Sequence, residues 1–161
     1  MGDIRVSWLE AQHNAYYLSR RLKNINLPPN RTGYVLVGRG GVAVACLLCR
    51  EVEMKYIFYL PVDKKGMNEF KAWFRDTWAS VIRSLDVNTL VVIDDINDTG
   101  ETLKEVLGLL NAYSGGKDLL PITLYKRATS TLTGTIFAHL ETSDSYLVFP
   151  WETETPEEVP F

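Results

Sequence analysis

The chain has 161 residues, of which 46% are hydrophobic and 23% are charged, and these values are typical of a globular domain with a substantial core. Its formal net charge of −3 gives no indication of a nucleic-acid-binding surface. No apolar run is long enough to span a bilayer, and the opening MGDIRVSWLE lacks the layout of a signal peptide. We therefore expect one domain over residues 1–161, a cytoplasmic location, and neither a membrane nor a nucleic acid as partner.

The first predicted element is a helix over residues 8–25. Ser7 is suited to be its N-cap, and Pro28 and Pro29 follow its end. Apolar residues recur along it at helical spacing, which predicts a buried face. The residues on that face are Trp8, Ala11, Ala15, Leu18 and Leu22.

A short buried strand is predicted over residues 34–38 and a helix over residues 42–52. The chain's two cysteines, Cys46 and Cys49, lie in this helix. A C-x-x-C pair can be a redox centre or half of a metal site, but the sequence has no second cysteine pair, and both histidines are far away. We expect the two cysteines to be buried as small apolar side chains.

A second strand is predicted over residues 55–62, and the following segment, residues 62–88, is the least standard part of the chain. It is unusually aromatic, and its apolar residues fit one helical stripe, with Lys71, Arg75 and Arg83 on other faces. The residues of the stripe are Met67, Phe70, Phe74, Trp78, Val81 and Leu85.

The rest of the chain continues the alternation of strands and helices. Strands are predicted over residues 90–94, 121–126, 133–140 and 145–151, a helix over residues 102–112, and a loosely held acidic tail over residues 152–161. Such alternation predicts a mainly parallel sheet. Ligands of these sheets bind outside the carboxyl ends of the strands, so GRGG (38–41) and DDINDTGET (94–102) are expected on one rim.

The chemistry of these two loops fits a phosphorylated sugar. Backbone N–H groups at a helix N-terminus, with threonine hydroxyls and a glycine that allows close approach, suit a phosphate. Asp94 and Asp95 can accept hydrogen bonds from vicinal hydroxyls or approach a divalent cation. In GRGG, backbone N–H groups and the Arg39 guanidinium can receive a diphosphate. Each loop alone is also compatible with an ordinary turn and helix cap.

The order strand, DD-x-x-DTG-x-T and helix resembles the signature for binding 5-phosphoribosyl-1-diphosphate (PRPP) in the type I phosphoribosyltransferases, and residues 91–102 match it position by position. More narrowly, the chain is similar to the bacterial xanthine-guanine phosphoribosyltransferases. The shorter matches are V-S-W at 6–8, GRGG with C-R-E after the helix, Lys126 at a strand end, and F-P-W-E at 149–152. The resemblance implies an α/β fold, with a mainly parallel sheet flanked by helices and a small hood subdomain.

The roles of individual residues are implied by this resemblance. Asp94 and Asp95 would bind the ribose hydroxyls and Mg²⁺, directly or through water, and Asp98 would in addition be the catalytic base, near N7 of a purine. The 5-phosphate would be enclosed by Thr99, Gly100, Glu101 and Thr102, and the diphosphate would be held by Arg39, Gly40 and Gly41. The base would be bound by Lys126, Tyr146 and Leu147. The implied reaction is Mg²⁺-dependent phosphoribosyl transfer from PRPP to guanine, xanthine or hypoxanthine, in a homodimer or homotetramer.

Residues 62–88 depart from the family pattern, because they lack the Ser-Tyr pair that 6-oxopurine members commonly carry in a mobile hood. The segment is either a helical insertion packed on the body or on another subunit, or a remodelled lid that brings Lys64, Lys65 or Arg75 to the diphosphate. The departure leaves two alternatives open. The chain could be a regulator of the same fold that senses PRPP or nucleotides, or a phosphoribosyltransferase for another base.

Overall fold

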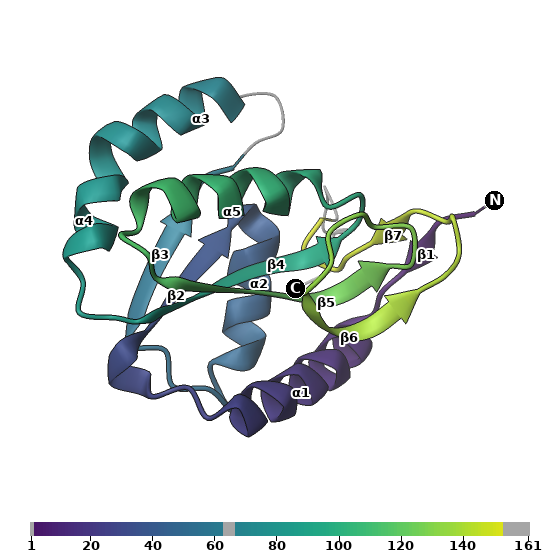
Figure 1. Cartoon of the computed structure of the whole chain (residues 1–161). Coiled ribbons are helices and arrows are strands. Elements are labelled where there is room, and N and C mark those ends of the chain that lie inside the picture. Colours follow the sequence, from purple (N-terminus) through teal and green to yellow (C-terminus); the bar gives the residue numbers. More distant parts are fainter. Residues whose placement is uncertain (1, 63–66, 153–161) are drawn as a thin grey trace, which may run out of the picture.

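A computed structural model of the chain describes residues 2–62 and 67–152 (Figure 1). Its main sheet has the strand order β3-β2-β4-β5-β6, and every neighbouring pair is parallel. The strands are β2 (Thr32–Val37), β3 (Tyr56–Leu60), β4 (Thr89–Asn97), β5 (Asp118–Arg127) and β6 (Ile136–Glu141). Two short strands, β1 (Ile4–Arg5) and β7 (Leu147–Val148), form a separate parallel pair. The predicted parallel α/β architecture is confirmed.

Helices cover both faces of the sheet (Figure 1). One face carries α1 (Trp8–Ile25) and α2 (Gly38–Leu48), and the other carries α5 (Glu101–Tyr113) with a run of three short helices, α3 (Met67–Trp73), η3 (Phe74–Trp78) and α4 (Ala79–Ser84). A 3₁₀ turn, η1 (Pro29–Arg31), precedes β2. Successive residues of β2 (34–37) and of β4 (90–93) enter the two cores alternately, so these central stretches are apolar on both faces, as is typical of a covered parallel sheet.

The strand order reverses between β2 and β4. From β2 the chain crosses to β3 on one side, and then returns to β4 on the other side and continues outward through β5 and β6. The carboxyl ends of parallel strands lie at the same edge of the sheet. A crevice therefore opens outside the ends of β2 and β4, which is where open α/β sheets bind ligands.

Helix α1 has the predicted bounds. Ser7 caps it by accepting a 3.1 Å hydrogen bond from the N–H of Glu10. The four smaller residues of the predicted face are buried, but the prediction is wrong for Trp8, which is 53% exposed. Trp8 lies in the first turn of α1, and its ring meets that of Trp151 edge-on at a centroid distance of 5.9 Å.

Helix α2 begins at Gly38, four residues earlier than predicted, because its glycines allow it to lie directly against β4. A Cβ at Gly40 would overlap the carboxylate of Asp95, and a Cβ at Gly41 would overlap the carbonyl of Ile93. The buried residues of α2 are Gly41, Val44, Ala45 and Leu48. Cys46 and Cys49 lie off this face and are exposed free thiols, so the prediction that they are buried is wrong.

Residues 67–84 are helical as predicted, but a π-helical turn at Phe74–Trp78 shifts the apolar stripe. The extra residue in this turn moves the buried positions from Trp78 and Val81 to Ala79 and Ile82. The segment packs on α5, where Lys71 forms a 2.6 Å ion pair with Glu105. Of the two interpretations of this segment, the described part fits a helical insertion packed on the body. The side chain of Met67, and also Lys64 and Lys65, lie outside the described residues.

Within residues 2–62 and 67–152, no helix combines the length and the apolar character that crossing a membrane requires. The predicted tail lies outside the described residues beyond Glu152.

Candidate functional site

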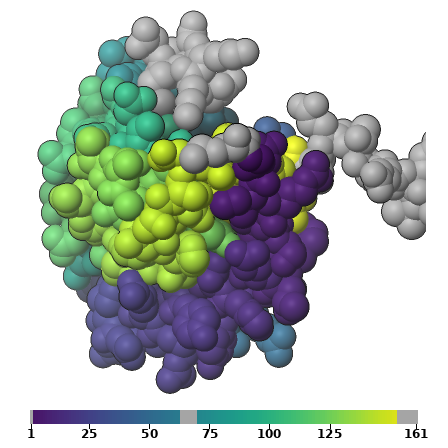
Figure 2. All heavy atoms as spheres, turned by 90° about the vertical axis from the view of Figure 1, so that its right-hand side faces the viewer, coloured from purple at the N-terminus to yellow at the C-terminus, as the bar shows by residue number. Residues whose placement is uncertain are grey.

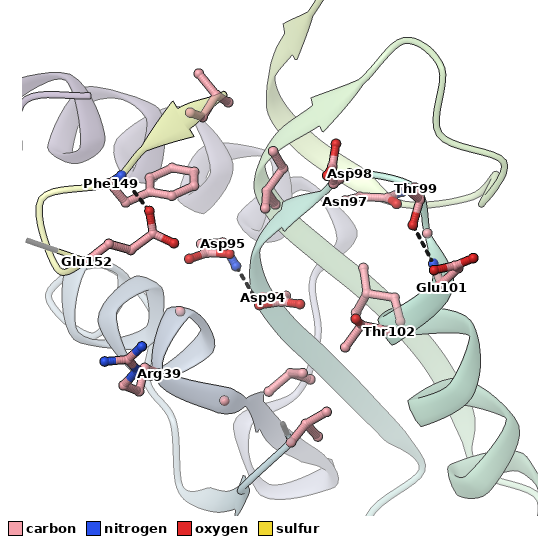
Figure 3. A pocket seen from close by; sticks show the side chains of 18 of the residues that line it. Arg39, Asp94, Asp95, Asn97, Asp98, Thr99, Glu101, Thr102, Phe149 and Glu152 are labelled. Atoms are coloured by element: carbon pink, nitrogen blue, oxygen red, sulfur yellow. Dashed lines mark hydrogen bonds between the residues drawn. The ribbon is translucent and has the colours of Figure 1, made fainter. Parts of the chain in front are cut away.

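A cavity of about 790 Å³ opens at the carboxyl edge of the sheet, between β2 and β4 (Figure 3). It brings the two predicted loops together, with Arg39 on the α2 side, Thr99 and Thr102 on the α5 side, and Asp94 and Asp95 between them. The predicted site residues that line it are Arg39, Gly40, Asp94, Asp95, Asp98, Thr99, Gly100, Glu101, Thr102, Tyr146 and Leu147. Gly41 and Lys126 do not line it.

The paired aspartates lie within β4, because this strand continues to Asn97 instead of ending at Asp94 as predicted. β4 is extended beyond Asp94 because its last residues pair with β5: Asp94 lies opposite Thr123, and Asn97 lies opposite Lys126. The ladder thus holds the backbone of the acidic pair rigidly. Asp94 is half-buried, and Asp95 is only 9% exposed.

Asp95 is a buried carboxylate. Burial raises its pKa, and the nearby charge of Glu152 raises it further, whereas a hydrogen bond from Trp151 acts in the opposite direction. In that bond the indole Nε1 donates to Oδ2 at 2.9 Å. A buried acid whose ionised form is disfavoured, in a cavity, is typical of a functional site.

The turn at residues 98–102 leads from β4 into α5, and it is called the phosphate loop here after the role that its sequence predicts. Gly100 is the N-cap of α5 with φ of 92°, a left-handed conformation that glycine adopts without strain. The N–H of Glu101 donates to Oγ1 of Thr99 at 3.3 Å. Thr99 and Glu101 are exposed, and residues 98–102 all line the cavity, so a helix N-terminus with two threonine hydroxyls meets the cavity, as in phosphate-binding turns.

A second loop, residues 128–135, supports the phosphate loop through hydrogen bonds, and no sequence pattern predicted this contact. Asn97, 1% exposed, donates through Nδ2 to Oγ1 of Thr135 at 2.9 Å and accepts from the hydroxyl of Ser130 at 2.6 Å. The N–H of Thr131 donates to the carbonyl of Thr99 at 3.2 Å. The phosphate loop is therefore preformed by contacts that appear only when distant segments meet.

Arg127, at the end of β5, lines the cavity in place of Lys126. Its Nε donates to Oδ1 of Asp98 at 2.5 Å. The side chain of Lys126 lies elsewhere, with Nζ 5.7 Å from the ring centroid of Phe137. Successive side chains of a strand point to opposite faces, so an offset of one residue decides which of the two enters the cavity.

Residues 146–152, here called the C-terminal wall, close one side of the cavity. Tyr146 is 61% exposed, and the rings of Phe149 and Trp151 stack with centroids 4.9 Å apart. The wall is anchored by the N-terminal strand, since the N–H of Ile4 donates to the carbonyl of Tyr146 at 2.8 Å. Figure 2 shows the two ends of the described chain, purple and yellow, side by side on this face.

The cavity is rich in carboxylates. Its acidic residues are Asp94, Asp95, Asp98, Glu101 and Glu152, and its basic residues are Arg39 and Arg127. Arg127 forms an ion pair with Asp98, whereas Arg39 is exposed and has no ion-pair partner among the described residues.

Among residues 2–62 and 67–152, no group of three or more acidic, histidine or cysteine side chains could hold a metal ion without further ligands. The donors suit Mg²⁺, which typically binds one or two carboxylates together with water and substrate phosphates.

The chain was compared with known proteins in sequence and in fold. No protein-family model matches the chain. The chain is 24% identical over 156 residues to xanthine-guanine phosphoribosyltransferase of Desulfotalea psychrophila, covering 93% of this chain and 86% of that protein. It is also 24% identical over 145 residues to the transcriptional regulator GfcR of Methanococcus maripaludis, covering 86% of this chain and 67% of that protein.

Among solved structures, the purine phosphoribosyltransferase of Pyrococcus horikoshii superposes with a TM-score of 0.69 at 17% identity, over 97% of each chain. The fold is that of the type I phosphoribosyltransferases, as predicted. Together with the curated relatives, this likeness supports a family relationship between the chain and these proteins.

Proposed function

We propose that this chain is a purine phosphoribosyltransferase that transfers the 5-phosphoribosyl group of PRPP to a 6-oxopurine and releases diphosphate. The observation that carries this proposal is the meeting of Arg39, the acidic pair of β4 and the phosphate loop around one cavity. A turn suited to an anion, hydroxyl acceptors and an exposed guanidinium then lie in the order in which PRPP carries its phosphate, its diol and its diphosphate.

In the proposed reaction the ribose is held at both ends while its C1–diphosphate bond breaks. The phosphate loop binds the 5-phosphate, and Asp94 and Asp95 accept hydrogen bonds from the ribose hydroxyls. Arg39 neutralises charge that develops on the leaving diphosphate. Asp98 accepts a proton from N7 of the purine as N9 forms the new bond to C1.

A divalent cation fits this proposal, because PRPP is a polyanion and the cavity is acidic. When bound, Mg²⁺ would supply positive charge that neutralises the phosphates of PRPP. Asp94 and Asp95 are the residues that would hold it, directly or through water. Their placement in β4 keeps them fixed without the cation.

The second candidate function is a regulator that binds PRPP or a nucleotide without turnover. The likeness to the regulator GfcR supports it. The cavity lining also supports it, because a catalytic site needs to exclude water and none of residues 70–84 is among the described residues that line the cavity. Arg39 favours the enzyme, because it is exposed, has no ion-pair partner within the part of the chain that the structure describes, and can therefore neutralise a leaving diphosphate.

One assay separates these functions. The purified chain is incubated with Mg²⁺, PRPP and a panel of purines and pyrimidines, while nucleotide and diphosphate are measured separately. Formation of a purine 5′-monophosphate together with equal diphosphate is the expected result. Tight PRPP binding without any nucleotide from any base would favour the regulator, and a pyrimidine nucleotide would correct the substrate class.

A further inference from the structure

Arg127 joins two segments that form opposite parts of the cavity. Its Nε donates to Asp98, and its Nη1 and Nη2 donate to the carbonyls of Ser143 and Ser145 at 2.6 and 2.7 Å. Asp98 belongs to the phosphate loop, whereas Ser145 directly precedes Tyr146 of the C-terminal wall. The side chain of Arg127 is only 11% exposed, so this fork is shielded from water.

We propose that Arg127 is a positioning residue that assembles the base-binding side of the cavity. This inference rests on the proposed function. With its Oδ1 held by Arg127, Asp98 is oriented and turns its second oxygen to a ligand as a hydrogen-bond acceptor. With the carbonyls of Ser143 and Ser145 held by the same fork, the exposed ring of Tyr146 is set at a defined distance from that acceptor.

Asp98 and Tyr146, held in this arrangement, would together recognise a flat heterocycle with an N–H group at its edge. The ring of Tyr146 offers an aromatic face, and Asp98 offers an ionised acceptor that an N–H group satisfies. Lysine cannot replace Arg127 in this task, because one ammonium nitrogen does not span three acceptors that diverge in one plane. Lys126 does not compensate, since its side chain lies over Phe137.

The experiment compares Arg127→Lys and Arg127→Ala with the parent chain and with Arg21→Lys as matched control. Arg21 also donates to a backbone carbonyl, that of Phe137 at 2.9 Å, but lies outside the cavity. For Arg127→Lys we expect the KM for the purine to rise about tenfold or more, while the calorimetric Kd for PRPP with Mg²⁺ changes by less than about threefold. Arg127→Ala is expected to show the larger rise in KM, and Arg21→Lys should match the parent in both.

Two results would overturn the positioning role. One is an unchanged KM for the purine in both Arg127 variants, and the other is an equal loss of purine and PRPP binding, which would indicate general damage to the fold.

A second measurement does not depend on activity. Amide hydrogen exchange of residues 142–147 should accelerate in Arg127→Lys, while that of β4 stays unchanged. If the parent forms no nucleotide, the proposed function fails, and exchange still decides whether Arg127 holds the two segments. Unchanged exchange in 142–147 would contradict the inference even in an active enzyme.

Discussion

The indole N–H of Trp151 donates a 2.9 Å hydrogen bond to the buried carboxylate of Asp95. It thereby connects the C-terminal wall to the centre of the cavity, 56 residues away along the chain. Because Asp95 is desolvated, this donor supports its ionised form against the effect of burial.

Replacing Trp151 by Phe keeps an aromatic ring beside Phe149, removes the indole N–H donor, and also removes part of the ring surface that packs there. We expect a loss of about 1–3 kcal/mol in the free energy of unfolding, the cost of leaving a buried acceptor without its partner, and weaker binding of PRPP. Urea unfolding and calorimetry measure the two effects. Trp8→Phe is the control, since Trp8 is exposed and only touches the ring of Trp151. Equal losses in both variants would show that packing, and not the hydrogen bond, matters.

Asp95→Asn should stabilise the protein without ligand while it abolishes activity. The folded-state pKa of Asp95 is raised above the unfolded value of 3.8. The stability that this group contributes is therefore fully present below that value, and it is lost as pH rises through the raised pKa. We expect Asp95→Asn to gain about 1 kcal/mol at pH 8. The gain should vanish on acidification, where Asp95 is itself neutral; a gain that is independent of pH would contradict this cause.

Asp98→Asn separates binding from chemistry. Asparagine keeps the oxygen that accepts from Arg127 but cannot take a proton from the base. A general base typically contributes about 10²–10⁴ in rate, so kcat should fall by at least about 100-fold, while the Kd for PRPP stays within a few-fold. Asp118→Asn, on an exposed residue at the opposite end of β5, is the control. If PRPP binding falls as much as turnover, Asp98 is not the base.

Gly40→Ala tests the close approach of α2 to β4. The added methyl group would displace the carboxylate of Asp95, and we expect lower affinity for PRPP and a lower melting temperature. Gly108→Ala is the matched control, because a Cβ there meets nothing within 4 Å, and alanine favours a helix by about 0.5–1 kcal/mol over glycine. We expect the melting temperature to fall in Gly40→Ala and to rise in Gly108→Ala. A rise in Gly40→Ala would refute the close contact between α2 and Asp95.

The sequence predicted the parallel sheet and the two main loops because these depend on local patterns. Apolar strands running into DDINDTGET and GRGG are recognisable residue by residue, and parallel strands bring their ends to one edge. The position of Ser7 as a helix cap is likewise a local property, and the structure has the hydrogen bond that it predicts.

The remainder of the site depends on contacts between distant segments. Nothing in the spacing of Lys126 and Arg127 indicates which one enters the cavity, since that depends on the register of β5 in the sheet. Asn97 reads as an ordinary loop residue until Ser130 and Thr135 surround it. The sequence also does not indicate the π-helical turn that shifted the apolar stripe. Trp78 and Val81 are apolar, as are Ala79 and Ile82, so the sequence fits an uninterrupted α-helix equally well.

The pairing of β1 with β7 makes the first few residues part of the cavity's architecture. Ile4 holds the backbone of Tyr146, and the N–H of Val6 donates to the carbonyl of Val148 at 2.9 Å. An affinity tag fused directly ahead of Ile4 would therefore press on the wall where the base is proposed to bind. Expression of this protein for kinetic work calls for a long flexible spacer before the tag, or for a tag that is cleaved off before any KM is measured.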